Sequence, residues 1–323
     1  MLPDSPSHAA HLYVTNEESG DLSVIDTGLR QELRRIALGK RPRGIAVSPD
    51  RRWLYVALSG SPAAPPGVDE NTLPPADKSA DGIAVIDVTT LEVARILVAG
   101  SDPEQVAVSR DGHRIFVANE DAARLSIVDV DSGRVVASVA VGVEPEGVAV
   151  SPDGERVYVT AEADNQVFVI DARTGARLTA VEVGPRPRSI AFLPDGSRAY
   201  VTCENGASVS VLSRDLTAPA RSVDLGAGMR PMGVVASRDG SRVFVSTGRS
   251  GMVLILEPAA GDRVAASIEA GQRPWGIAVS ADGRTVYTAN GPSNDVSVID
   301  VESRRVTMRV RVGSKPWGLA LID

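Results

Sequence analysis

Residues 142–154 read GVEPEGVAVSPDG: a glycine, two residues, a proline, a small and apolar segment, and a tight turn. This phrase begins seven times along the chain, and its prolines are Pro42, Pro103, Pro145, Pro187, Pro231, Pro274 and Pro316. Successive prolines are 61, 42, 42, 44, 43 and 42 residues apart. A period near 42 is the length of one four-stranded propeller blade. The sequence therefore predicts an all-β fold, a seven-bladed β-propeller of four-stranded antiparallel blades.

One repeat shows how a blade is read from the residues. Residues 147–150 alternate small and large apolar side chains, which suits a strand buried on both faces. Residues 151–154 carry the Pro, Asp and Gly typical of a hairpin turn. Residues 156–160, 165–171 and 176–183 are predicted as the next three strands, because they are rich in β-branched and aromatic side chains or bounded by turn signals.

The two ends of the chain complement one another. The last copy, residues 313–321, stops after its first strand, and residues 11–15, 22–26 and 33–38 supply the three strands that it lacks. We therefore predict that one blade is built from both termini, which closes the ring and leaves no open sheet edge. The whole chain, residues 1–323, is predicted to be one propeller domain, with a flexible N-terminus over residues 1–10.

Two features interrupt the regular repeat. The 61-residue spacing is longer than the period by about 19 residues, and the excess lies in a Pro-, Gly-, Ser- and Asp-rich insertion over residues 59–81. A long loop on a tight scaffold is either a functional lid or a tolerated addition. The first repeat has Arg51 where other repeats have the turn glycine, which predicts a small strain at a left-handed position.

Composition excludes several classes of protein. The 323-residue chain is 43% hydrophobic and 23% charged, as in an ordinary globular protein, and nothing approaches the ~18 apolar residues of a membrane span. A net charge of -7 argues against sequence-independent binding to nucleic acid. The single cysteine, Cys203, excludes an intramolecular disulfide and is predicted to be a packed residue. Residues 1–10 show no secretion signal, which predicts a cytosolic chain or a mature exported form.

Charged residues flank the repeated prolines. In a propeller, the loops that enter the first strands gather at one mouth of the central channel, so these charges are expected there. The basic ones come from five repeats: Arg41, Arg43, Arg186, Arg188, Arg230, Arg273 and Lys315. The acidic ones come from the other two repeats: Asp102, Glu104, Glu144 and Glu146. We predict a basic and an acidic arc that bind a small ionic ligand or orient a partner protein, the alternative being charges that only solvate loops.

Further candidates lie at the same mouth. Trp275 and Trp317 follow the prolines of adjacent repeats, where they either stack on a ligand or fill the gap between blades. Gln105 and Ser189 replace the glycine that opens the first strand in other repeats. Polar residues also follow the second strands: Asn16, Glu17, Asn119, Glu120, Glu162, Glu204, Asn205 and Asn290.

Catalytic signatures are sparse. The chain has three histidines without metal-ligand spacing and no paired cysteines, so no metal, no cofactor and no specific catalytic residue are predicted. The leading hypothesis is a non-catalytic protein that binds a small ligand or a partner protein at the mouth. The enzymatic alternative is a lyase or lactonase, as other propellers are, with Glu144, Glu146, Glu162 or Glu204 as acid or base.

The second strands resemble those of the YVTN β-propeller family, named for a tetrapeptide that occurs here as Tyr13-Val14-Thr15-Asn16 and in variants such as Tyr158-Val159-Thr160. This resemblance covers all seven copies and implies the propeller fold. A role reported among such relatives, binding of single-stranded nucleic acid, is a second alternative, which the acidic net charge disfavours.

A narrower resemblance is to propellers associated with pyrroloquinoline-quinone-dependent alcohol catabolism. The similar segments include Asp102-Pro103-Glu104, residues 116–121, residues 142–147, residues 291–300 and Pro316-Trp317-Gly318. The family is exported, so this resemblance implies a periplasmic protein that accompanies quinoprotein dehydrogenases or transporter components. The protein is expected to be a monomer. The quinone cofactor would belong to those partners.

Overall fold

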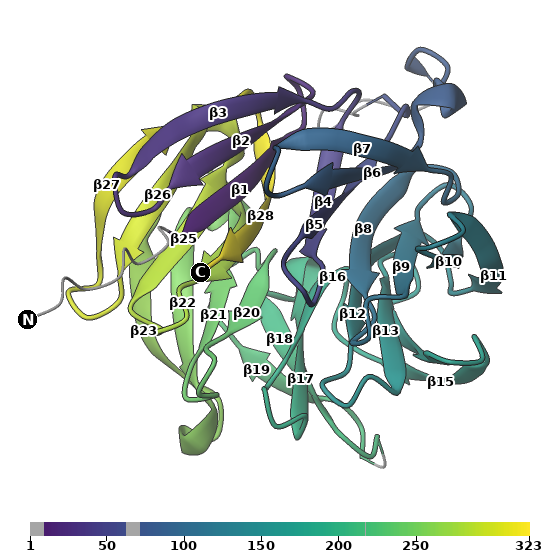
Figure 1. Ribbon diagram of the computed structural model, residues 1–323. Helices are drawn as coiled ribbons and strands as arrows, with labels where there is room; N and C mark the ends of the chain where they lie inside the picture. The colour runs from purple at the N-terminus through teal and green to yellow at the C-terminus, as the bar shows by residue number, and fades with distance from the viewer. Residues whose placement is uncertain (1–9, 63–71, 217) are drawn as a thin grey trace, which may run out of the picture.

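The structure, a computed structural model, describes residues 10–62, 72–216 and 218–323. Within these ranges the strands form seven four-stranded antiparallel sheets arranged as blades around a central axis (Figure 1). The predicted seven-bladed propeller is confirmed. Most of the predicted flexible N-terminus, residues 1–9, and residues 63–71 of the insertion lie outside the described residues.

The strands occupy equivalent places in every blade. The innermost strands are β28 (Pro316–Ile322), β4 (Pro42–Val47), β8 (Pro103–Val108), β12 (Pro145–Val150), β16 (Pro187–Phe192), β20 (Val234–Ala236) and β24 (Pro274–Val279). The second strands are β1 (His11–Asn16), β5 (Trp53–Leu58), β9 (Arg114–Asn119), β13 (Arg156–Ala161), β17 (Arg198–Cys203), β21 (Val243–Ser246) and β25 (Thr285–Asn290).

The outer half of each blade is equally regular. The third strands are β2 (Asp21–Asp26), β6 (Gly82–Asp87), β10 (Arg124–Asp129), β14 (Gln166–Asp171), β18 (Ser208–Ser213), β22 (Met252–Glu257) and β26 (Asp295–Asp300). The outermost strands are β3 (Gln31–Ala37), β7 (Glu92–Leu97), β11 (Arg134–Ala140), β15 (Arg177–Glu182), β19 (Arg221–Asp224), β23 (Arg263–Glu269) and β27 (Arg305–Arg311). Short 3-10 helices are η2 (Lys78–Ala80), η3 (Glu204–Gly206), η4 (Gly248–Ser250), η5 (Pro258–Ala260) and η6 (Gly291–Ser293).

The two ends of the chain share a blade, as predicted. The sheet order β28-β1-β2-β3 places the last strand beside the first, and Leu12 pairs with Leu321 in the antiparallel register. Figure 1 shows the yellow β28 beside the purple β1. Since β28 also contacts both β4 and β24, the ring has no gap at the termini.

The hydrophobic core lies between the blades. The buried apolar residues form seven clusters, and each cluster combines side chains from two neighbouring blades. Phe116, for example, packs with Val159 and Ile170 of the next blade. No blade can bury its faces alone, so stability depends on the closed ring. No helix among the described residues is long and apolar enough to cross a membrane.

A hydroxyl group explains the threonine of the Tyr-Val-Thr strand. Thr160 Oγ1 accepts a 2.7 Å hydrogen bond from the backbone N–H of Gly147 in its own blade and donates a 3.1 Å bond to the carbonyl of Arg188 in the next blade. The same link between blades is made by Thr15, Thr202 and Ser246. Gly147 itself approaches the neighbouring backbone, because a Cβ there would lie 2.2 Å from the Arg188 carbonyl oxygen.

Smaller sequence predictions also hold. Arg51 has a φ of 62°, in the left-handed region where the equivalent Gly154 has 79°. Cys203 is fully buried at the end of β17, and burial raises the pKa of its thiol, which makes it a packed rather than a reactive residue.

Candidate functional site

The first strands carry a bulge where they enter the channel. In β12 the register with β13 shifts between Pro145 and Val148, and equivalent shifts occur in β4, β8, β16, β24 and the β28 pair. A bulge re-aims side chains at the end of a strand. The residues directly after the seven prolines thereby form a ring at the mouth: Arg43, Glu104, Glu146, Arg188, Met232, Trp275 and Trp317.

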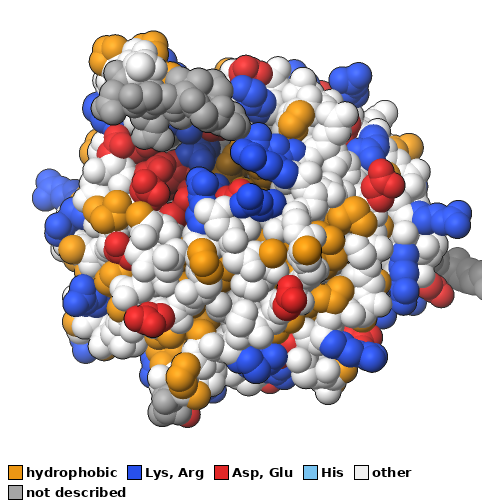
Figure 2. All heavy atoms as spheres, turned by 180° about the vertical axis from the view of Figure 1, so that it is seen from behind, with side chains coloured by type: hydrophobic (Ala, Val, Ile, Leu, Met, Phe, Trp, Pro, Cys, Tyr) orange, Lys and Arg blue, Asp and Glu red, His pale blue; other side chains and the backbone are white. Residues whose placement is uncertain are grey.

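The mouth opens into a hollow of about 940 Å³ (Figure 2). Acidic side chains lie on one side of the hollow and Lys or Arg side chains on the other. Its lining includes most of the predicted charged residues: Arg41, Arg43, Asp102, Glu144, Glu146, Glu162, Arg186, Arg188 and Arg273, with Trp275. The tertiary structure therefore brings together residues that lie more than two hundred positions apart.

The described parts of the insertion form one wall of this hollow. Pro62 and residues 73–76 line it, and hydrogen bonds hold both flanks in place. Lys78 pairs with Asp121 of the next blade, and Arg41 Nη1 donates a 2.6 Å bond to the Ser61 carbonyl. The insertion is thus part of the site, which favours the functional reading of this loop.

The first ion-pair group lies between two neighbouring blades. The Arg43 guanidinium contacts Glu104 and lies 3.8 Å from Glu17 and 3.9 Å from Glu120. Its carbon lies 5.2 Å from the centre of a Trp317 ring, at cation–π distance. Glu104 is fully buried, so its charge depends on this one guanidinium.

The second ion-pair group lies two blades further along. Arg188 pairs with Glu146 at 3.0 Å and with Glu162, while Arg186 Nε lies 2.8 Å from Glu162 and 3.4 Å from Glu204. Both oxygens of Glu162 are engaged by guanidinium groups. The side chain of Arg188 is only 11% exposed.

Ion pairs join the two predicted arcs of opposite charge where they meet. The arginines and the acids of adjacent blades stand side by side at the mouth, so they neutralise one another in ion pairs. Arg41 likewise pairs with Glu17 at 3.1 Å. The spacing in the sequence did not reveal this pairing, because it depends on which repeats become neighbours around the ring.

Two carboxyl groups in the hollow have strongly raised pKa values. Burial, reinforced by the charge of Glu146, raises the pKa of both Glu120 and Glu162 to about 7. Burial also acts on Glu146, but the guanidinium groups of Arg188 and Arg43 outweigh it and hold the pKa of Glu146 below its ordinary value. A carboxyl group with a pKa near 7 can accept or release a proton at neutral pH.

Glu120 is the accessible member of this set. Its side chain is 35% exposed, it lines the hollow, and its carboxylate makes no hydrogen bond with any residue that the structure describes. The sequence places Glu120 at the end of a second strand, equivalent to Glu17, Glu162 and Glu204. It was not among the candidate acids or bases of the enzymatic alternative, because position alone does not separate a carboxylate that is hydrogen-bonded to a guanidinium group from one that is not.

Several predicted site residues lie outside the hollow or already have hydrogen-bond partners. Asn119 and Asn290 are buried inside their blades and line neither the hollow nor the channel cavity. The Asn290 amide donates to Asp295 at 2.6 Å and to Ser297 at 2.8 Å, so it joins β25 to β26. Arg230 hydrogen-bonds the neutral side chain of Asn205. Asn119 and Asn290 therefore have a structural role.

The aromatic side of the mouth has different contacts. Trp275 and Trp317 meet edge to face, with ring centroids 6.4 Å apart and an interplanar angle of 72°. Arg273 lies over a Trp275 ring at 5.1 Å and, within the described chain, makes no ion pair or hydrogen bond. Burial and the nearby charge of Arg249 lower the pKa of Arg273. Arg273 is thus a cation that is available to an anion in the hollow.

One group of acids in the described ranges has the spacing of a metal site. The ligand oxygens of Asp102, Glu104 and Glu120 lie within 4.8 Å of one another. The Arg43 guanidinium pairs with Glu104 and approaches Glu120, so a positive charge already compensates this group. We assign the three acids to the ion-pair network rather than to a metal.

Six residues before the prolines have left-handed backbones. Their φ values lie between 40° and 57°, and the residues are Arg41, Asp102, Glu144, Arg186, Arg273 and Lys315. Such conformations are costly for residues other than glycine and are concentrated at functional sites. Five of the six, all except Lys315, carry charged side chains that line the hollow.

Comparisons with known proteins give two partial family matches. Residues 68–156 match the model of the YNCE-like beta-propeller, and residues 179–314 match that of the 7-bladed beta-propeller lactonase. No curated protein sequence matches the chain significantly.

Solved structures agree with the fold. A candidate 6-phosphogluconolactonase from Bacteroides fragilis is 17% identical, covers 99% of this chain and 100% of its own, and has a TM-score of 0.78. A second one from Bacteroides uniformis is 16% identical, covers 98% of this chain and 100% of its own, and has a TM-score of 0.79. Hydrazine synthase from Kuenenia stuttgartiensis is 20% identical over 90% of this chain and 92% of its own, with a TM-score of 0.78.

These findings correct the leading hypothesis drawn from the sequence. The lactonase match over residues 179–314 contradicts a non-catalytic scaffold and supports the enzymatic alternative. Neither family match bears on the finer resemblance to quinone-associated propellers, which stays a prediction. The chain is a seven-bladed β-propeller with a YNCE-like segment in its first half and a lactonase-type segment in its second half.

Proposed function

We propose that this protein hydrolyses a lactone in the mouth hollow, with Glu120 as the general base. The observation that carries the proposal is the Glu120 carboxyl group, which is accessible, free of hydrogen bonds with the described residues and shifted to a pKa of about 7. A base whose pKa lies near the working pH combines a sufficient ionised fraction with a sufficient affinity for the proton. The lactonase family match supports the class of reaction.

The reaction needs three events at one carbonyl group. The Glu120 carboxylate removes a proton from a water molecule, whose oxygen adds to the lactone carbonyl carbon. The carbonyl electron pair moves onto oxygen, and the Arg43 guanidinium, 3.9 Å from Glu120, stabilises that negative charge. The ring C–O bond then breaks, and the protonated Glu120 returns its proton to the leaving ring oxygen. The product is an open-chain hydroxy acid.

The other ion-pair group has a positioning role in this proposal. Glu162 is engaged on both oxygens by Arg186 and Arg188, so it is less available than Glu120 to act on water. It holds the two guanidinium groups in the wall of the hollow. Arg273, which has no ion-pair partner in the described chain, is placed to bind an anionic group of a substrate.

Glu120→Gln tests the proposal. Hydrolysis of glucono-δ-lactone, 6-phosphoglucono-δ-lactone and γ-lactones would be followed by acid release. We expect Glu120→Gln to lower kcat/KM at least about 100-fold, and Glu120→Asp to retain part of the activity. Glu182→Gln, on an exposed outer strand, is the matched control. Wild-type kcat/KM should rise with pH and level off above an apparent pKa near 7, since only the ionised carboxylate is a base.

Two results would count against this function. One is the absence of hydrolysis for every lactone tested, and the other is an unchanged pH profile in Glu120→Gln. A periplasmic location, a monomeric state and a partner protein remain further proposals, which fractionation and co-purification would test.

A further inference from the structure

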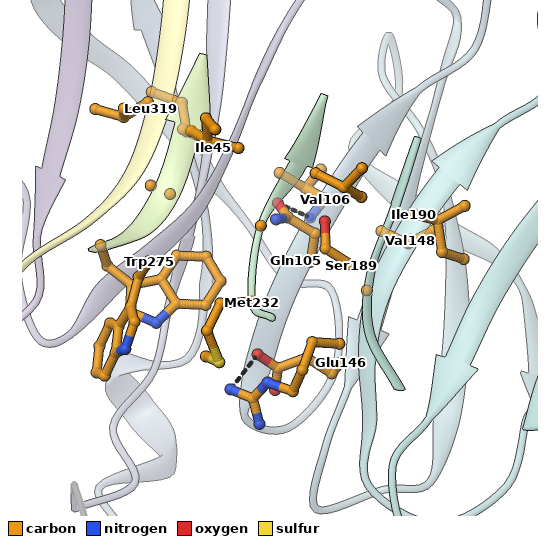
Figure 3. A pocket seen from close by; sticks show the side chains of 18 residues that line it. Ile45, Gln105, Val106, Glu146, Val148, Ser189, Ile190, Met232, Trp275 and Leu319 are labelled. Carbon is orange, nitrogen blue, oxygen red and sulfur yellow. Dashed lines mark hydrogen bonds and ion pairs between the residues drawn. The ribbon is translucent and has the colours of Figure 1, made fainter. Parts of the chain in front are cut away.

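A second cavity lies deeper in the channel, beneath the ring of mouth residues (Figure 3). Its volume is about 230 Å³. Seven aliphatic side chains, one from the inner strand of each blade, surround its inner part: Ile45, Val106, Val148, Ile190, Val234, Ile277 and Leu319. The lactone chemistry proposed above makes no use of this space.

The cavity changes in polarity with depth. At the mouth end, Trp275 and Met232 face Glu146, which is joined to Arg188 by the ion pair drawn in Figure 3. Gln105 and Ser189 lie at the middle level, and the aliphatic side chains lie beyond them. The side-chain carbonyl oxygen of Gln105 accepts a 3.0 Å hydrogen bond from the backbone N–H of Val106.

No charged side chain reaches the aliphatic level, since the only charged residues lining the cavity within the described chain are Glu146 and Arg188 at its mouth. An ionic group placed there would lose its hydration without a compensating charge. A phosphate or carboxylate is therefore excluded from the aliphatic level, which suits an apolar group.

The inner cavity adjoins the mouth hollow. Glu146, Arg188 and Trp275 line both spaces, so one molecule can occupy the two together. Apolar cavities of about 150 Å³ bind benzene, and the 230 Å³ here includes the polar mouth and middle levels, so the aliphatic level accommodates a group of no more than about six carbon atoms. Methionine adapts to groups of varied shape, which suits Met232 at the entrance.

We propose that the inner cavity binds the hydrocarbon arm of an amphipathic substrate whose polar end lies in the mouth hollow. For the reacting end this rests on the proposed lactone hydrolysis, and the substrate class becomes a lactone with an alkyl or single-ring substituent. The apolar-binding site itself does not depend on that activity.

Tryptophan fluorescence offers a test that needs no turnover. The chain has three tryptophans, and Trp53→Phe leaves only Trp275 and Trp317, both at the cavity. The full chain with this substitution would be titrated with straight-chain alcohols from butan-1-ol to octan-1-ol. We expect the affinity to rise about three- to fourfold per methylene until the chain length exceeds the cavity.

Substitutions that fill the cavity provide the matched comparison. Val234→Phe and, from another blade, Leu319→Phe should each abolish the dependence on chain length. Val98→Phe should leave it unchanged, because Val98 is 75% exposed and lies outside the channel. Melting curves would identify a variant that fails to fold. If one of the two filled variants does not fold, the other one tests the proposal.

The outcomes separate this inference from the proposed function. Affinity that does not depend on chain length, or that survives both filled variants, would overturn the cavity proposal even if lactones are hydrolysed. Binding that behaves as expected, with no lactone hydrolysed, would retain the cavity and reject the lactonase. If both proposals hold, γ-octalactone should exceed γ-butyrolactone in kcat/KM, and Val234→Phe should remove that preference.

Discussion

Thr15 Oγ1 donates a 2.7 Å hydrogen bond to the carbonyl oxygen of Arg43 across the boundary between two blades. The same hydroxyl accepts from the backbone N–H of Gly318 at 2.8 Å. One buried side chain thus joins the last strand, the first strand and the next blade of the ring. It also fixes the backbone of Arg43, whose guanidinium lies beside Glu120.

Replacing Thr15 by valine keeps the shape and removes the hydroxyl. The buried carbonyl of Arg43 and the N–H of Gly318 then lose their partner, so Thr15→Val should lower the free energy of unfolding by about 1–3 kcal/mol. Denaturant unfolding measures the change. Thr90→Val, on an exposed turn, is the control, and an equal effect of both substitutions would show that the link between blades contributes nothing.

The raised pKa of Glu120 predicts how stability depends on pH. An ordinary glutamate ionises near 4.5, whereas Glu120 in the folded protein does so near 7, so between these values the folded state holds a proton that the unfolded chain has lost. Stability therefore falls as pH rises through this window and stays lower above it. Glu120→Gln should raise the Tm at pH 8 and reduce its fall between pH 5 and pH 8. An identical Tm profile in the variant would contradict the assigned pKa.

Arg188 supports two buried carboxylates. Arg188→Met leaves Glu146 and Glu162 without this cation, and breaking a buried pair costs about 3–5 kcal/mol. Because protonation of Glu162 relieves the unpaired charge, the loss should be larger at pH 8 than at pH 5. Urea unfolding at both pH values tests this prediction. Arg34→Met, on the exposed outer strand β3, should change stability little.

Deleting residues 316–323 removes β28. The deletion exposes β1 and takes Leu319 and Leu321 from the cluster that joins the first and last blades. We expect a large drop in Tm for the whole molecule, or no cooperative melt. Deleting Asp323 alone keeps β28 and should leave the Tm nearly unchanged. An unaltered melt in the longer deletion would argue against ring closure as a source of stability.

Arg273 should distinguish anionic from neutral substrates. Arg273→Gln is expected to raise KM about tenfold for 6-phosphoglucono-δ-lactone, the effect of losing one charge-assisted hydrogen bond. It should leave kcat, and the KM of neutral γ-lactones, nearly unchanged. Arg284→Gln, in an exposed turn, is the control. A loss of kcat on both kinds of substrate would indicate a role other than anion binding.

The candidate site was only partly predictable. The repeat placed Arg43, Glu146, Arg188 and Trp275 at one mouth, and all four lie there. The repeat did not single out Glu120. Its pKa depends on burial and on Glu146 of the next blade, and neither can be read from a strand-end position.

The sequence by itself determined the ring: the period of the prolines, the turn residues and the complementary termini require seven blades closed by β28 and β1. These are local patterns, repeated along the chain, so each copy confirms the others. Only the tertiary structure decided which charged side chains form ion pairs with one another and which do not. Arg43 reaches Glu104 and Arg188 reaches Glu146 because adjacent blades bring their first strands together, and electrostatic interactions depend on distance in space and on burial, not on separation along the chain.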